Sequence, residues 1–523
     1  MKHSILLTCI ISLISPAAFA QEENADAIAQ AAHSAEIAGH SLSKVHRWLH
    51  DIALPKIDKK TGLYIADGEW NYRNTAADCY PFLTWAAWAT DKEALNGPVR
   101  SILHAERALC NVKGRIPAPY NYKEQKSINI KDEDLVFEAS EYVKDCLIAI
   151  VEITGRDEWF DRMRAIEDDL WEYADIETPF GLIPSTNIEV NGEQLQALAR
   201  LYTMTGDEKY LTGAMRLADY YFADENFVPT RLRDHGCEII GGLGLLQAVL
   251  TTHRPEKAAE YGDRLKKMYD TILERGTLDV GMMYNHLTKR DGWNGGMSDG
   301  WGYNYVGYLC YDMAMGTSIY TAHMIATLTS MMDPKYKDYP WEGESIDGYA
   351  DSIEGAIYML NRLPVAKGFE WVNRETRNNI VDHPKRLENG ELWGTMKLQA
   401  NGVRTTVMQA LMHTQGVLAR PWQQALELGA APVANGVVIA VRTKEGYEGL
   451  LEFDIPRHRL YMGFQKDWPR MNTVPEWFTV EPQESYAVTM DGVTNTYTGA
   501  QLHNGLAVEL EANQTLILTI ATR

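Results

Sequence analysis

The chain has 523 residues, of which 45% are hydrophobic, and its formal net charge is −21 at pH 7. An acidic chain of this kind argues against a nucleic-acid partner, because binding to phosphates requires a basic surface. An acidic substrate stays open, since a few arginines in a cleft can override the field of the whole protein. The length suits one large domain and a smaller one.

The first 20 residues have the pattern of a secretory signal peptide. A basic start precedes an apolar run over residues 5–14, and the segment ends in Ala-Phe-Ala at residues 18–20. The apolar run is too short to span a bilayer. We expect cleavage after Ala20 and a secreted or periplasmic protein, and no later stretch is apolar enough for a membrane span.

The cysteines favour buried free thiols over a disulfide framework. The count that remains after the signal peptide is odd, and the sequence has no CxxC motif. Most of them lie in apolar helical patterns. They are Cys79, Cys110, Cys146, Cys237 and Cys310.

Short turns that contain Thr, Gly and Asp recur along the chain. Thr154-Gly155-Arg156-Asp157 and Thr205-Gly206-Asp207-Glu208 each follow an apolar helical pattern and precede an amphipathic one. Glycine ends the first helix, and an acidic residue starts the next. Recurrence at a spacing of roughly 50–65 residues predicts a repeated unit, here a helix hairpin.

Taken in chain order, the helical patterns form six pairs. The first member of each pair is amphipathic, whereas the second is apolar on all sides, as over residues 239–246. A helix that is apolar all round is buried, so the second members should form an inner ring. This pattern predicts an (α/α)6 toroid over residues 21–430. The expected pairs are 33–54 with 76–89, 98–110 with 135–153, 158–173 with 188–202, 208–222 with 238–250, 256–273 with 303–331, and 346–363 with 403–417.

The pattern changes after Pro432. Apolar or alternating runs at residues 437–441, 450–454, 459–462, 486–489 and 516–520 are separated by turn residues. Such runs predict a small antiparallel β-sandwich, which we assign to residues 431–523.

The long loops from outer to inner helices should open on one face and carry the ligand site. Their aromatic rings can stack on sugar faces, their amides and carboxylates can bind hydroxyls, and their arginines can pair with uronate carboxylates. Each carboxylate has a plainer alternative as a helix cap or an ion pair. The sixth loop also carries His383 and Trp393. The candidate substrate-binding residues are Trp70, Arg73, Asn187, Asn191, Arg231, Arg233, Trp293, Asp299, Trp301, Tyr305, Trp371 and Arg404.

Two kinds of catalytic group are candidates. His235 lies between two acidic residues, so it could act as a general acid or base, although the same residues could form a capping box. Paired carboxylates are the alternative, as in glycosidases. No third ligand accompanies His235 and Glu238, so neither a metal nor another cofactor is expected. The candidate catalytic residues are Asp78, Glu138, Glu141, Asp234, His235, Glu238 and Tyr303.

The hairpins, the acidic and aromatic loops and the export signal resemble the six-hairpin carbohydrate-active enzymes. That group includes unsaturated glucuronyl and rhamnogalacturonyl hydrolases, exo-glucuronidases and toroid polysaccharide lyases. The resemblance implies a carbohydrate substrate and leaves the reaction open. Asp78 lies where such hydrolases often keep a carboxylate, but residues 75–80 do not match their signature.

Three functions follow as hypotheses. The first is an exported glycoside hydrolase that acts on oligosaccharides containing uronic acid, with carboxylates as acid and base. The second is a polysaccharide lyase in which His235, Tyr303 or Tyr305 removes a proton. The third is a glycan-binding protein without catalytic groups.

Overall fold

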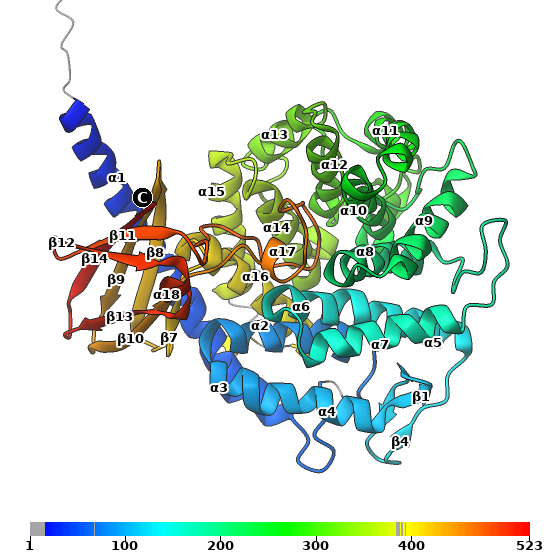
Figure 1. The fold of residues 1–523 in the computed structure, drawn as a ribbon, viewed down its shortest axis with the longest axis horizontal. Helices are drawn as coiled ribbons and strands as arrows, with labels where there is room; N and C mark the ends of the chain where they lie inside the picture. The colour runs from blue at the N-terminus through cyan, green and yellow to red at the C-terminus, as the bar shows by residue number, and fades with distance from the viewer. Residues whose placement is uncertain (1–15, 67, 383–386, 389–390, 393, 523) are drawn as a thin grey trace, which may run out of the picture.

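A computed structural model describes residues 16–66, 68–382, 387–388, 391–392 and 394–522. Most of these residues are helical, and small antiparallel sheets gather toward the C-terminus (Figure 1). Residues 1–15 of the predicted signal peptide, and the loop residues His383 and Trp393, lie outside the described residues. No helix among the described residues is long and apolar enough to cross a membrane.

The apolar helices contact one another in a closed succession. The first of them, α2, contacts α6 and α16; α10 contacts α8 and α12; and α14 joins α12 to α16. A π-helical segment at Tyr142–Ile148 connects α5 to α6 and contacts α8. This part of the chain consists of α2 (Tyr80–Thr90), α5 (Asp132–Glu141), α6 (Ala149–Thr154), α8 (Ile188–Thr205), α10 (Glu238–His253), α12 (Trp301–Met315), α14 (Ile346–Leu360) and α16 (Met396–Thr414).

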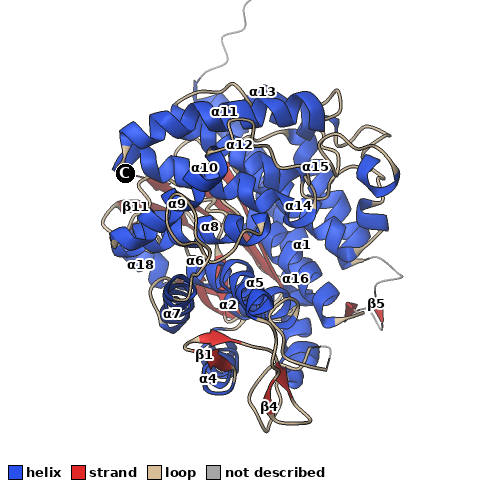
Figure 2. Ribbon diagram, turned by 90° about the vertical axis from the view of Figure 1, so that its right-hand side faces the viewer, coloured by secondary structure: helices blue, strands red, loops and turns tan. Residues whose placement is uncertain are grey.

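The amphipathic helices pack against these inner helices, and most of them lie toward the outside of the helical part in Figure 2. The predicted turns end and begin helices as expected. Gly206, with φ +73°, ends α8, and the Asp157 carboxylate accepts hydrogen bonds from Trp159 N and Phe160 N at the start of α7. The outer helices are α1 (Pro16–Arg47), α3 (Lys92–Ala94), α4 (Arg100–Leu109), α7 (Glu158–Glu172), α9 (Glu208–Phe222), α11 (Pro255–Gly276), α13 (Thr321–Ser330) and α15 (Ala366–Glu375).

The predicted number of six hairpins is not confirmed. Residues 303–331, expected as one helix, break at Gly316, whose φ is +65°. The Asp312 carboxylate accepts hydrogen bonds from Ile319 N and Tyr320 N, so it stabilises a turn between α12 and α13. Helix α15 lies in the segment that was expected to be a loop. These differences add a helix pair to the described chain.

The C-terminal strands form a five-stranded sheet in the order β12-β11-β14-β9-β8 and a three-stranded sheet in the order β13-β10-β7, all antiparallel. Helix α1 packs against β8 and β9, and a Cβ at Gly429 would lie 2.0 Å from Ala35 N. A face-to-face sandwich is not confirmed. The strands are β7 (Leu418–Arg420), β8 (Leu426–Val433), β9 (Gly436–Thr443), β10 (Tyr447–Glu452), β11 (Ser485–Met490), β12 (Val493–Thr498), β13 (Leu506–Leu510) and β14 (Thr515–Thr522), with α18 (Gly499–Asn504) between β12 and β13.

Short strands also pair in the loops of the helical part. They are β1 (Asn111–Lys113) with β2 (Ile116–Pro117), β3 (Tyr120–Asn121) with β4 (Lys126–Ser127), and β5 (Leu387–Glu388) with β6 (Glu391–Leu392).

Residues 453–484 leave the sheets between β10 and β11 and reach the inner helices; we call them the inserted segment. Figure 1 shows its helix α17 (Arg457–Leu460) beside the helical part of the molecule. The prediction of a strand at residues 459–462 was therefore wrong. Buried Glu152 accepts from Arg470 Nε and Arg200 Nε, both at 2.8 Å, and so ties the inserted segment to α6 and α8. This attachment brings residues of the C-terminal part to the inner helices.

The cysteines behave as predicted. All five in the described residues are free and buried.

Candidate active site

A polar cavity lies where the starts of several inner helices converge. Most of its side chains come from the first turns of these helices or from the turns before them. Met471 and Asn472 reach it from the inserted segment. A larger groove lies between α1 and α15, and it is lined mainly by side chains of these outer helices and not by the starts of the inner helices. The cavity is lined by Asp78, Lys144, Asp145, Asp234, His235, Cys237, Glu238, Tyr303, Asp347, Asp351, Glu354, Lys397, Arg404, Met471 and Asn472.

Asp78 has a carboxyl group suited to donate a proton. Burial raises its pKa to about 6, helped by repulsion from Asp347 and opposed by Lys397. Lys397 Nζ lies 3.2 Å from Asp78 Oδ2 and 3.3 Å from Asp347 Oδ2. The lysine therefore limits how far the pKa of Asp78 rises.

The carboxyl group of Asp234, unlike that of Asp78, has a lowered pKa. Burial favours its neutral form, but the charges of His235, Arg231 and Arg233 outweigh burial and lower its pKa. Its carboxylate pairs with Arg231 and lies 3.2 Å from His235 Nε2. The backbone of Asp234 has φ +48°, a left-handed conformation that a non-glycine residue rarely adopts and that often accompanies functional sites.

His235 is surrounded by carboxylates. Its Nδ1 lies 3.2 Å from Glu189 Oε1 and 3.8 Å from Glu141 Oε1. Burial lowers its pKa, but attraction to Asp234, Glu189 and Asp145 is larger in sum and raises it. The imidazole therefore favours its protonated form. The capping-box alternative is not observed, because neither Arg233 nor Cys237, the N-cap residues of the 3-10 turn and of α10, makes a side-chain cap.

Arg404 and Tyr303 belong to a buried network at one wall of the cavity. Arg404 Nη2 donates to Asp351 Oδ1 at 2.6 Å, and Tyr303 OH donates to Glu354 Oε2 at 2.6 Å. Burial raises the pKa of Tyr303 well above 10. Its hydroxyl is thus a hydrogen-bond donor near neutral pH.

Glu238 is held by its neighbours. Lys144 Nζ and Gln196 Nε2 each donate to its carboxylate at 2.6 Å. The same lysine donates to Asp145 Oδ1 at 2.6 Å. Glu238 therefore positions Lys144 and Asp145 beside the cavity.

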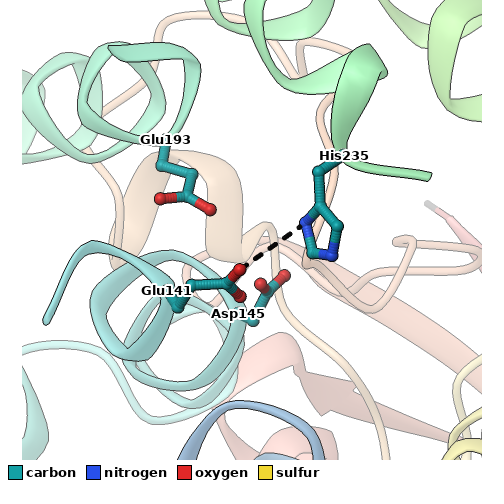
Figure 3. A group of neighbouring side chains, drawn as sticks. All are labelled: Glu141, Asp145, Glu193 and His235. Carbon is teal, nitrogen blue, oxygen red and sulfur yellow. Dashed lines mark ion pairs between the residues drawn. The ribbon is translucent and has the colours of Figure 1, made fainter. Parts of the chain in front are cut away.

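A cluster beside the cavity could hold a metal ion. Glu141, Asp145, Glu193 and His235 each offer one ligand atom, and these atoms lie within 4.8 Å of one another (Figure 3). Burial raises the pKa of Glu141 and Glu193. Burial also acts to raise the pKa of Asp145, but the charges of Lys144 and His235 outweigh it and lower that pKa.

The predicted catalytic residues mostly converge. Among them, Glu141 lies beside His235, whereas Glu138 lies apart and faces Arg73, with 3.5 Å between Oε1 and Nε. Asp299 lies next to the site, and its carboxylate accepts from Gly300 N at 2.8 Å. Those that line the cavity are Asp78, Asp234, His235, Glu238 and Tyr303, together with the predicted binding residue Arg404.

The predicted sugar-stacking aromatics mostly lie in the core. Trp70, Trp301 and Trp371 are fully buried and offer no ring face to a ligand. Tyr305 is also buried, and its hydroxyl donates to Gly281 O at 2.6 Å. Trp293 differs, since 49% of it is exposed.

The predicted asparagines have local structural contacts. The Asn187 side chain accepts from Glu189 N and caps α8. Asn191 is buried, and its Nδ2 donates to Ser185 O and Tyr221 OH. Neither lines the cavity.

Sequence reasoning missed six of the eleven ionic side chains in the cavity and two uncharged ones. Three of them lie on α14 with spacings of four and three residues, which place side chains on one helical face. That spacing could have identified the three α14 residues from the sequence. No sequence pattern indicated that the inserted segment approaches the cavity. The missed residues are Lys144, Asp145, Asp347, Asp351, Glu354, Lys397, Met471 and Asn472.

Comparison with known proteins gives structural neighbours only. No family model and no curated protein matches the chain. An α-1,6-mannanase of Salegentibacter sp. is 15% identical with a TM-score of 0.41, covering 59% of this chain and 97% of its own. A GH127 β-arabinofuranosidase is 12% identical with a TM-score of 0.39, and the match covers 95% of this chain and 76% of the arabinofuranosidase. A cellobiose 2-epimerase from Spirochaeta thermophila is 10% identical with a TM-score of 0.39, and the match covers 71% of this chain and 96% of the epimerase.

These neighbours are carbohydrate-active enzymes, the class that the sequence resemblance named, and no single family is assigned. Because their TM-scores are below 0.5, the reaction and the substrate must be inferred from the residues of this chain.

Proposed function

We propose that the protein is a glycoside hydrolase in which Asp78 is the general acid and Asp234 the general base or nucleophile. The observation that carries this proposal is the opposite displacement of two pKa values in one cavity: that of Asp78 is raised to about 6, and that of Asp234 is lowered. Environments that move two carboxyl pKa values apart are those that glycosidases use for their two roles.

In this mechanism, Asp78 donates its proton to the glycosidic oxygen as the bond to the sugar breaks. Ionised Asp234 either removes a proton from the attacking water or attacks the anomeric carbon itself. Lys397, Asn472 and the α14 carboxylates supply donors and acceptors for sugar hydroxyls. The side-chain contacts of Asp234 with Arg231 and His235 keep it ionised and fix its orientation.

The lyase alternative has weaker support. A lyase base must take a proton, but His235 favours its protonated form and Tyr303 ionises well above pH 10. Carboxylates also outnumber lysines and arginines around the cavity, which disfavours a uronate beside the reacting groups.

The proposal that the saccharide carries uronic acid rests on Arg233. Its guanidinium lies 5.4 Å from the Trp293 ring centroid, and no carboxylate within ion-pair distance is found for it among the described residues. We also propose that the protein is exported, on the signal-peptide pattern of residues 1–20.

A panel of neutral and uronate-containing oligosaccharides tests the function. We expect new reducing ends without a new near-ultraviolet absorbance, because hydrolysis creates no unsaturated uronyl group. A rise in that absorbance would instead identify a lyase. Binding without any cleavage across the panel would favour the glycan-binding hypothesis. The anomer first released, read by NMR, distinguishes a general base from a nucleophile in the role of Asp234.

A further inference from the structure

Glu193 on α8 has a fully buried carboxyl group. Its exposed fraction is 0%, and neither of its carboxylate oxygens has a partner among the described residues. Figure 3 shows this carboxylate directed into the space that Glu141, Asp145 and His235 share. A buried, unpartnered carboxylate is costly, and a cation bound between Glu193 and the three other donors would offset that cost.

The donor atoms are close to the spacing that one ion requires. The four atoms lie within 4.8 Å of one another, and His235 Nδ1 is 3.8 Å from Glu141 Oε1. Donors of a tetrahedral ion at about 2.1 Å are separated by roughly 3.4 Å. The cluster would therefore contract by about 1.5 Å or less around an ion, within the reach of side-chain rotations.

The outer partners of the donors also suit a metal site. While Nδ1 of His235 faces the cluster, its Nε2 lies 3.2 Å from Asp234 Oδ1. A carboxylate on the second ring nitrogen is the usual support for a histidine that binds a metal. Asp145 Oδ1 accepts from Lys144 Nζ at 2.6 Å and from Asn472 Nδ2 at 3.1 Å, so its other oxygen can bind an ion.

We propose that Glu141, Asp145, Glu193 and His235 bind one divalent first-row transition-metal ion, for which Zn²⁺ is the probe. An imidazole nitrogen among carboxylates favours this class over Ca²⁺ and Mg²⁺, which prefer oxygen donors alone. Glu189 Oε1 lies 3.2 Å from His235 Nδ1, so it borders the proposed site without belonging to the group of four donors. Because a ligand imidazole must be neutral, binding of the ion would displace the proton that His235 otherwise favours. The proposal does not depend on the glycosidase function, and it differs from the sequence prediction of no metal.

Calorimetric titration of the chelator-treated, full-length protein with Zn²⁺ tests the site. We expect one equivalent to bind to the wild type, and Glu193→Gln to weaken binding by at least about tenfold. The control is Glu167→Gln, which changes another fully buried glutamate outside the cluster and should keep wild-type affinity. If Glu193→Gln does not fold, as judged by circular dichroism, His235→Asn takes its place.

Co²⁺ gives a second readout that requires no substrate. Visible absorption of the Co²⁺ protein should appear with one equivalent and be lost in His235→Asn. The proposal would be overturned by absent stoichiometric Zn²⁺ binding, or by equal affinity in the wild type and Glu193→Gln. A second acidic cluster contains His458, so binding that is lost only in His458→Asn would also overturn it. If the protein binds Ca²⁺ tightly and does not bind Zn²⁺, the assignment of the site to a transition-metal ion is wrong.

Discussion

Replacing Lys397 by methionine should move the pH dependence of catalysis in a known direction. Asp78 must be protonated to act as a general acid, so activity should fall as the pH rises through its pKa of about 6. Lys397 favours the ionised form of Asp78. Without the lysine the pKa of Asp78 rises, and the alkaline side of the pH profile should move to higher pH.

The size of this effect follows from the distance between the two charges. At the observed 3.2 Å, the Coulomb attraction is about 1.3 kcal/mol with the dielectric constant of water and roughly 5 kcal/mol at an effective value of about 20. The Lys397 side chain is 30% exposed, which favours the lower part of this range. Since about 1.4 kcal/mol corresponds to one pKa unit, we expect a shift of about 1–2 pH units.

The assay is the pH profile of kcat/KM for reducing-end release, with Lys397→Arg as the charge-conserving control. A carbon-13 NMR titration of aspartate carboxyl groups, with Asp78→Asn to assign the signal, measures the same pKa without substrate. An unchanged profile in Lys397→Met, or a shift to lower pH, would refute the role of Asp78 as the acid.

Three further predictions concern stability. Glu152→Gln removes the carboxylate that buried Arg200 and Arg470 share, although Arg470 keeps its ion pair with Asp467, and it should lower the free energy of unfolding by about 3–5 kcal/mol in urea titrations. No change would mean that this contact does not hold the inserted segment. Gly192→Ala would place a Cβ 2.4 Å from the backbone of α10 and should cost about 1–3 kcal/mol, whereas Gly97→Ala has open space and should match the wild type in thermal melts. Burial lowers the pKa of His413 from 6.5 to about 4, because the buried site disfavours the protonated imidazole. The contribution of His413 to the free energy of unfolding is therefore full above pH 6.5 and falls by about 3 kcal/mol in total as the pH falls toward 4. His413→Gln should therefore flatten the pH dependence of the melting temperature over this range, and an equal acid sensitivity in both proteins would contradict that pKa.

The helical part of the fold was predictable because its signals are local. Apolar periodicity and Thr-Gly-Asp turns identified most helices, and Asp157 and Gly206 end or begin helices as those turns require. The break at Gly316 was not predicted, because apolar residues continue on both sides of it and the turn depends on the Asp312 carboxylate.

The site was predictable in part for the same reason. Asp78, Asp234 and His235 lie at helix starts, so the hairpin pattern placed them on a common face. Asn472 could not be found, because its approach depends on contacts between Arg470 and Glu152, which are 318 residues apart. Composition also cannot distinguish a tryptophan that binds sugar from one that packs in the core, as buried Trp371 illustrates.

The most direct test of the proposed mechanism compares the hydrolysis rates of Asp78→Asn and Asp234→Asn on whichever oligosaccharide the wild type cleaves. Each substitution should lower kcat by at least about a hundredfold, as expected for loss of an acid or base. The control is Asp219→Asn. Asp219 lies on the outer helix α9, where its carboxylate accepts a hydrogen bond from Tyr261 OH, and this variant should keep wild-type turnover. Wild-type turnover in Asp78→Asn or Asp234→Asn would contradict the assignment of the catalytic pair.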